Sequence, residues 1–193
     1  MDSHRPEETL SSASKRRSEF APEVVLISGG VNSGKTTAVV RLVAELKHAG
    51  IRVGGVLSHG VWSDGKKVGI VVENIASGES RPLAHVDSGS SATRQGRYRF
   101  FDDGLYFGVT ALLDATEARV IFVDEVGPLE LREEGFAPAV RSLLRTATGL
   151  IIMVVREGLT EQVTRHFELS SSTRVVRADE RGIERLRGIV DGC

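Results

Sequence analysis

The chain is poor in cysteine, in aromatic side chains and in long apolar runs. It has one cysteine, Cys193, among 193 residues, which excludes an internal disulfide and a cysteine-based metal site. A single cysteine is compatible with a reducing compartment, and we expect the protein in the cytoplasm. The longest apolar run, residues 150–155, is far shorter than the roughly 20 residues that span a bilayer. The sequence therefore predicts no membrane partner.

Net charge is also nearly absent. Lys and Arg number 25 and Asp and Glu number 26, which gives a formal charge of -1. A dedicated nucleic-acid binder is usually clearly basic, so nucleic acid is not an expected partner, although this balance does not exclude a local basic patch. The first residues are polar and carry both signs of charge, without the apolar core of a secretory signal. We predict a disordered tail over residues 1–21 and one domain over residues 22–193.

What the chain does contain is a strand that leads into a phosphate-binding loop. An apolar run, residues 24–27, precedes a segment that fits G-x-x-x-x-G-K-[ST] in full. Glycines let the backbone bring several N–H groups close to an anionic phosphate, and the following helix adds the positive end of its dipole. Lys35 places a positive charge at the terminal phosphates, and the Thr36 hydroxyl is suited to bind Mg²⁺. The predicted nucleotide-binding residues of the loop are Gly29, Gly30, Val31, Asn32, Ser33, Gly34, Lys35, Thr36 and Thr37.

A second apolar strand ends in two acidic residues, Asp124 and Glu125. In phosphate-loop proteins, ligands gather at the carboxyl ends of the parallel strands, so this pair is expected beside the loop. We assign Asp124 to the metal, which it would hold through water, and Glu125 to orienting or deprotonating the attacking water. Lys35 and the loop amides would neutralise the charge that develops on the phosphates. The predicted catalytic groups are therefore Lys35 and Glu125, and the predicted Mg²⁺ ligands are Thr36 and Asp124.

Strands and helices alternate along most of the chain. The predicted strands cover residues 51–57, 98–101, 119–123, 149–155 and 173–176, and the predicted helices include residues 136–146, 159–167 and 179–190. A hairpin is predicted around Asp64 and Gly65, because Asp-Gly favours a tight turn between two strands. This pattern predicts an α/β fold, a P-loop NTPase three-layer sandwich whose sheet is mainly parallel and carries an antiparallel hairpin insertion.

Residues 124–131, Asp-Glu-Val-Gly-Pro-Leu-Glu-Leu, match the pattern D-E-[IV]-G-[PM]-[ML]-E-L. In this motif and in the order of its predicted elements, the chain resembles the THEP-type nucleoside-triphosphatases. The resemblance implies Mg²⁺-dependent hydrolysis of ATP, GTP and other nucleoside triphosphates to the diphosphate. It also implies that residues 29–37 bind the nucleotide and that Asp124 and Glu125 form the acidic pair. Glu130 matches the later acid of the motif, and we expect its carboxylate to accept backbone N–H groups of its own turn.

Two arginines are further candidates for this site. Arg156 follows the apolar strand at residues 149–155 and is expected to reach the γ-phosphate as an arginine finger supplied in cis. Arg181 lies where such domains often contact the base, and we expect it to bind the nucleotide there. Because the sequence pattern fixes neither arginine, we expect slow intrinsic turnover.

Two other functions fit the same loop. A nucleoside or nucleotide kinase would need an acceptor pocket and an arginine-rich lid, and residues 94–99 are the one lid-like segment. A nucleotide-switched binding module is the other alternative, because residues 124–127 fit the D-x-x-G of switch GTPases. The chain has no N-K-x-D guanine-reading motif, so we expect broad base specificity. The sequence names no protein partner.

Overall fold

The structure is a computed structural model that describes residues 22–29 and 35–192. The tail predicted over residues 1–21 lies outside this description, as do residues 30–34 of the phosphate loop. Within the described ranges, no helix is long and apolar enough to cross a membrane.

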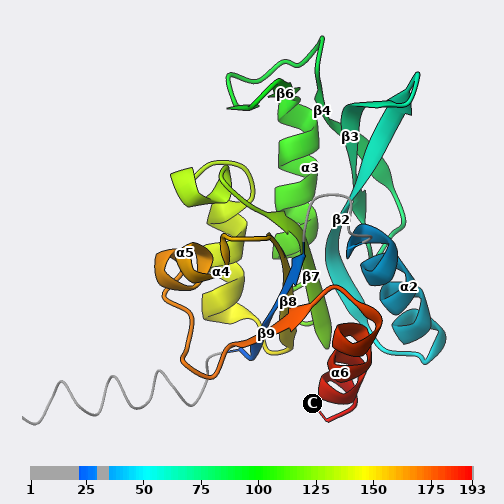
Figure 1. The fold of residues 1–193 in the computed structure, drawn as a ribbon, viewed down its shortest axis with the longest axis vertical. Coiled ribbons are helices and arrows are strands. Elements are labelled where there is room, and N and C mark those ends of the chain that lie inside the picture. The colour runs from blue at the N-terminus through cyan, green and yellow to red at the C-terminus, as the bar shows by residue number, and fades with distance from the viewer. Residues whose placement is uncertain (1–21, 30–34, 193) are drawn as a thin grey trace, which may run out of the picture.

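The described residues build a nine-stranded sheet in the order β5-β6-β4-β3-β2-β7-β8-β1-β9 (Figure 1). Its strands are β1 (Val24–Gly29), β2 (Val53–Ser63), β3 (Lys66–Asn74), β4 (Ser80–His85), β5 (Arg94–Gln95), β6 (Tyr98–Phe100), β7 (Val120–Val126), β8 (Leu150–Arg156) and β9 (Arg174–Arg177). Strands β2, β7, β8, β1 and β9 run parallel, whereas β3, β4, β6 and β5 are antiparallel to their neighbours. The antiparallel part is larger than the predicted hairpin insertion, because β4, β5 and β6 extend it.

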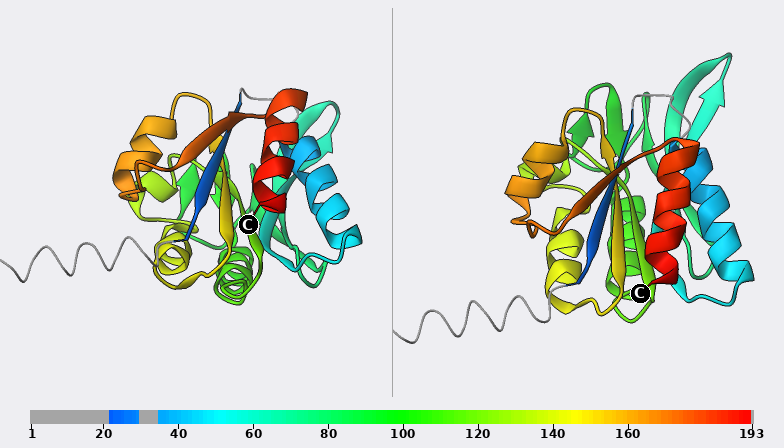
Figure 2. Two further views of the ribbon diagram at one scale, coloured as in Figure 1. Left: turned by 90° about the horizontal axis from the view of Figure 1, so that it is seen from below. Right: turned by 60° about the horizontal axis from the view of Figure 1, so that its bottom comes forward.

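Helices cover both faces of this sheet. They are α2 (Lys35–His48), α3 (Asp102–Leu113), α4 (Ala137–Thr146), α5 (Thr160–His166) and α6 (Glu180–Asp191), with the short 3-10 helix η1 (Glu130–Arg132). Neighbouring residues of a strand point to opposite faces, so Leu26 packs in the core under α3, α4 and α5, and Val25 packs in the core under α2 and α6. Figure 2 shows α2 and α6 side by side, and Arg187 of α6 donates two hydrogen bonds to Glu45 of α2, at 2.8 and 2.9 Å. The α/β class is confirmed.

Local signals explain where the later helices begin and end. The side chain of Asp179 caps α6 by accepting a hydrogen bond from the Gly182 N–H at 2.8 Å. Helix α4 accommodates Pro138 in its first turn, where a missing N–H has no intrahelical partner to lose. The three helices predicted after residue 135 agree with α4, α5 and α6 to one residue at each end.

Strand β2 is longer than predicted. The strand expected over residues 51–57 and the first arm of the hairpin are one strand, which pairs with β7 through its first residues and with β3 through the rest. The predicted turn at Asp64 and Gly65 is confirmed, because both residues have positive φ, 48° and 71°, as a type I′ turn requires. In Figure 1 this hairpin extends beyond the helices at the upper right. Its base forms a wall of the site described next.

Candidate active site

The parallel strands β7, β8 and β1 lie next to one another, and their carboxyl ends lie at the same side of the sheet. Gly29 at the end of β1 pairs in register with Arg156 at the end of β8, and Asp124 and Glu125 lie on β7, on the other side of β8. Thr36, in the first turn of α2, joins Asp124, Glu125 and Arg156 around one cavity of about 160 Å³. The fold therefore brings together residues that are far apart in the sequence.

Asp124 is one of two buried acids of this cavity, with 2% of its surface exposed. The Ser58 N–H on β2 donates to Asp124 Oδ2 at 3.0 Å, and the Ser58 hydroxyl donates to the Asp124 carbonyl oxygen at 2.5 Å. Burial raises the pKa of Asp124 to about 6, a shift that the Ser58 N–H opposes and the charge of Glu125 reinforces. At pH 7 the carboxyl is therefore mainly ionised, which is the form that binds a cation, and Ser58 fixes its position.

Glu125 forms an ion pair with Arg156. Arg156 Nε donates to Glu125 Oε1 at 3.3 Å, and the two side chains are 41% (Arg156) and 38% (Glu125) exposed. An ion pair with this much solvent contact contributes at most about 1 kcal/mol. It is therefore readily exchanged for contacts with a bound phosphate or water.

Glu130 lies in the wall of the cavity and is 4% exposed. The Gly127 N–H donates to its Oε2 at 2.9 Å, which confirms that the carboxylate accepts a backbone N–H of its own turn. The Phe136 N–H donates to its Oε1 at 3.3 Å, so one carboxylate also closes the loop between β7 and α4. Burial raises the pKa of Glu130 to about 7, although both N–H groups favour the ionised form.

Comparison with known proteins establishes the family. The nucleoside-triphosphatase THEP1 of Thermofilum pendens is 38% identical over 127 residues, which are 65% of this chain and 69% of that protein. The THEP1 of Caldivirga maquilingensis is 30% identical over 151 residues, 78% of this chain and 84% of that protein. A family model described as "NTPase" matches residues 24–189. The chain belongs to the THEP-type nucleoside-triphosphatase family. It is thus an enzyme that hydrolyses nucleoside triphosphates, as the motif at residues 124–131 predicts.

Two solved structures are similar to this THEP-type fold. A human cancer-related nucleoside triphosphatase matches with a TM-score of 0.68 at 25% identity, over 89% of this chain and 97% of that one. THEP1 from the hyperthermophile Aquifex aeolicus also matches with a TM-score of 0.68, over 87% of this chain and 99% of that one. At 17% identity, the second likeness concerns the fold alone.

The cavity of this NTPase also contains residues outside the predicted catalytic, nucleotide-binding and metal-binding sets. Ser58 and Lys67 line it from β2 and β3, and Tyr98 and Phe100 line it from β6. The Tyr98 hydroxyl donates to the Lys67 carbonyl oxygen at 3.1 Å, which ties β6 to β3. The aromatic-rich stretch around Tyr98 is a local signal for a buried strand, but only its pairing with β4 places it at the cavity.

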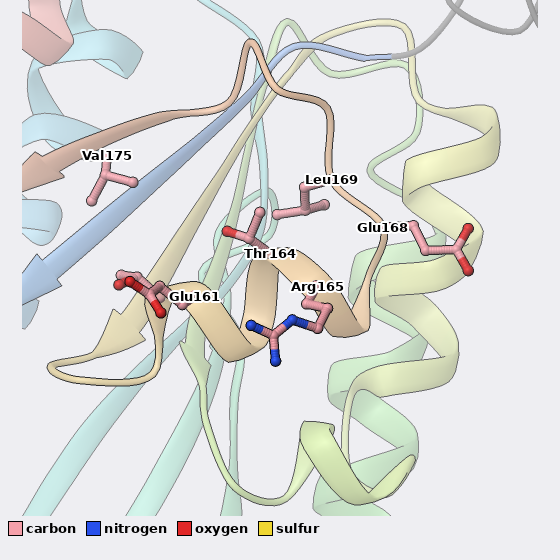
Figure 3. A pocket seen from close by; sticks show the side chains of 7 residues that line it. Glu161, Thr164, Arg165, Glu168, Leu169 and Val175 are labelled. Carbon is pink, nitrogen blue, oxygen red and sulfur yellow. The ribbon is translucent and has the colours of Figure 1, made fainter.

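Arg181 lies apart from these residues. It is exposed in the first turn of α6, which follows β9 at one edge of the sheet, whereas the cavity lies over β7, β2 and β3. A base contact of Arg181 therefore stays a prediction. A surface groove lies between α5 and β9 (Figure 3), and it is lined by Thr160, Glu161, Thr164, Arg165, Glu168, Leu169 and Val175. In Figure 3 Glu168 points away from Val175, and the groove contains none of the predicted site residues.

The donor atoms at the cavity suit Mg²⁺. Within the described part of the chain, no group of three or more His, Cys, Asp and Glu side chains could hold a metal ion. Mg²⁺ does not need such a group, because it is usually bound by one or two carboxylates together with substrate phosphates and water. The Asp124 carboxylate and the Thr36 hydroxyl, which line the same cavity, are oxygen donors of this kind.

The raised pKa of Glu130 predicts a pH-dependent stability. Its pKa is about 7 in the folded protein against an ordinary value of 4.5, so between these pH values the folded state keeps a proton that the unfolded state releases. The free energy of unfolding should therefore fall by about 3 kcal/mol as the pH rises through this window. Glu130→Gln should lose this part of the slope, measured by urea unfolding at several pH values. Glu117→Gln, at an exposed position, should keep the wild-type slope; an unchanged slope in Glu130→Gln would contradict the assignment.

Proposed function

We propose that this enzyme hydrolyses ATP, GTP and other nucleoside triphosphates with Mg²⁺, slowly and with little preference for the base. The observation that carries the proposal is the convergence of Thr36, Asp124, Glu125 and Arg156 on one cavity beside the end of β1. Transfer of a γ-phosphoryl group depends mainly on positioning and on neutralising charge, and these residues supply both.

Two oxygen donors and the phosphate loop would hold the substrate. The Thr36 hydroxyl and, through water, the Asp124 carboxylate would bind Mg²⁺, and the ion would supply positive charge next to the β- and γ-phosphates. Ser58 keeps the Asp124 carboxylate in place through its N–H. Lys35 and the loop amides would donate hydrogen bonds to the phosphate oxygens.

Glu125 is the proton acceptor in this proposal. It orients the attacking water and takes a proton from it as the oxygen approaches the γ-phosphorus. Arg156, once it leaves Glu125, donates to the γ-phosphate oxygens and stabilises the charge that they carry in the transition state. Because the exposed contact with Glu125 leaves Arg156 without a fixed place at the γ-phosphate, we expect slow turnover by the enzyme alone.

We expect broad base specificity because the predicted site residues recognise the phosphates of the substrate. The phosphate loop, Asp124 and Glu125 all act on phosphates, which every nucleoside triphosphate carries. Arg181, our candidate for contacting the base, is an exposed side chain in the first turn of α6, and a contact from such a side chain would select weakly among bases. We further propose that residues 22–193 form one three-layer P-loop domain, which the helices on both faces of the sheet support, and that it works in the cytoplasm.

Phosphate release from ATP, GTP, CTP and UTP tests this function. With Mg²⁺ the four rates should agree within about tenfold, which corresponds to about 1.4 kcal/mol of discrimination. Excess EDTA should abolish release, and Lys35→Ala should reduce it by about 10²-fold or more, because a charged donor to the phosphates is lost.

Lys47→Ala, a change at the other end of α2, is the matched control and should leave phosphate release unchanged. Release that persists in EDTA would contradict the metal assignment. A single accepted base would contradict the broad specificity, and the absence of release from all four nucleotides would overturn the proposed function.

A further inference from the structure

The cavity extends beyond the residues proposed for hydrolysis. A water molecule would occupy the end beside Asp124 and Glu125, but the cavity of about 160 Å³ continues over β3, β4 and β6. Its wall there combines the polar residues Lys67, Gln95 and Glu130 with six apolar or aromatic side chains from β3, β4, β6, α3 and the loop before α4, which are Ile70, Leu83, Tyr98, Phe100, Leu105 and Phe136. Leu83, Phe100 and Phe136 are buried, whereas Ile70, Tyr98 and Leu105 are half-buried. Apolar surface is costly to leave against water, so the half-buried part of this wall favours a second ligand.

The size of the cavity limits that ligand to about one ring. A protein cavity of about 150 Å³ lined by Leu, Ile and Phe accepts a benzene molecule. The present cavity is of the same size, at about 160 Å³ including the end beside Asp124 and Glu125 where the hydroxyl group would lie. A nucleoside, which joins a base to a ribose, is too large for it. The cavity therefore does not suit the acceptor of a nucleoside or nucleotide kinase.

The polar groups of the cavity are unevenly placed. Asp124, Glu125 and Arg156 lie at the ends of β7 and β8 and line the cavity together with Thr36. Elsewhere in the wall the polar groups bond to other protein groups: the Tyr98 hydroxyl donates to the Lys67 carbonyl oxygen at 3.1 Å, Arg132 donates to Gln95 Oε1 at 3.3 Å, and the Glu130 carboxylate accepts from the Gly127 and Phe136 N–H groups. A ligand would thus place its ring against the apolar wall and a hydroxyl group beside Glu125.

We propose that this cavity binds a small single-ring alcohol as a phosphoryl acceptor, so that the enzyme is also a phosphotransferase. The proposal rests on the proposed function, because it uses the same nucleotide site and the same Glu125. The alcohol oxygen forms a bond to the γ-phosphorus, and the bond from the γ-phosphorus to the β–γ bridging oxygen breaks, with its electron pair leaving on the nucleoside diphosphate. Glu125 takes the hydroxyl proton. The products are a phosphate monoester and the nucleoside diphosphate. When no alcohol is bound, water attacks the γ-phosphorus instead.

Labelled ATP distinguishes the two reactions. The enzyme is incubated with γ-labelled ATP, Mg²⁺ and either benzyl alcohol, 3-pyridinemethanol or thymidine, and labelled phosphate and labelled ester are separated by chromatography. The two single-ring alcohols should give labelled ester that increases with alcohol concentration at the expense of labelled phosphate, whereas thymidine should give none. Phosphate without ester from either single-ring alcohol would overturn the acceptor site and leave the hydrolase intact. If the enzyme forms neither labelled phosphate nor labelled ester, the proposed function itself is overturned.

A cavity-filling variant tests whether the ester forms at this place. Leu105→Phe adds volume inside the cavity and should reduce ester formation by about tenfold or more while phosphate release stays at the wild-type rate. Leu113 is the last residue of the same helix and is 42% exposed. Leu113→Phe should therefore change the amount of neither product. Ile70→Phe fills the cavity from β3 and serves as the second variant if Leu105→Phe does not fold. Ester formation that survives both filling variants would overturn the proposal.

Discussion

Glu125→Gln is expected to reduce the kcat of nucleoside-triphosphate hydrolysis by about 10²- to 10⁴-fold, the range that general base catalysis contributes. Glutamine has the same shape, and its amide oxygen can still accept the hydrogen bond that Arg156 Nε donates to Glu125 Oε1 at 3.3 Å. What it cannot do is take a proton from the attacking water. The loss should therefore appear in kcat, with nucleotide affinity and KM nearly unchanged, because only an interaction of the transition state is removed.

Glu157→Gln is the matched control for this experiment. Glu157 follows Arg156 directly and is exposed. Its change to glutamine removes the same charge, so this variant should hydrolyse nucleotide at the wild-type rate. The measurement is steady-state phosphate release with ATP, together with equilibrium nucleotide binding. Full turnover by Glu125→Gln would show that another group accepts the proton, and weakened nucleotide binding would assign Glu125 to holding the substrate instead.

The part of the site that could be predicted from the sequence consists of residues at the ends of apolar runs, because such runs are local patterns. An apolar run followed by acids predicts a buried strand with polar groups at its carboxyl end, and the structure places Asp124 and Glu125 there on β7. Parallel strands end at the same edge of a sheet, so Arg156 at the end of the next apolar run is expected close by, and its contact with Glu125 at 3.3 Å agrees. These inferences need only the direction of each strand.

The other half depends on pairings between distant residues. Ser58 holds Asp124, but its position depends on β2 continuing past the point where its pairing with β7 ends, which no motif signals. Tyr98 and Phe100 reach the cavity only because β6 pairs with β4, so the antiparallel part of the sheet exceeds the predicted hairpin. Such pairings are set by packing across the whole domain, which a single sequence does not display.

Gly55→Ala is expected to destabilise the fold more than any surface change, because β2 and β7 approach closely at this residue. Gly55 has φ +96° and pairs with Phe122, and a Cβ at Gly55 would lie 2.0 Å from the Phe122 carbonyl oxygen. Strain at this φ costs about 1–3 kcal/mol, and forcing two backbones apart costs a similar amount, so the free energy of unfolding should fall by about 2–6 kcal/mol. A domain of ordinary stability, about 5–15 kcal/mol, would lose a large part of its margin.

Gly65→Ala separates the two causes of this loss. Gly65 also has positive φ, +71°, but an added Cβ there would meet nothing within 4 Å, so only backbone strain of about 1 kcal/mol is expected. Urea unfolding followed by circular dichroism gives both values. The close approach at Gly55 also sets the register that brings the Ser58 N–H to Asp124, so any folded Gly55→Ala protein should hydrolyse nucleotide more slowly than Gly65→Ala. Equal stability of the two variants would show that β2 can move away from β7 without cost, and Ser58 could then not be what fixes Asp124.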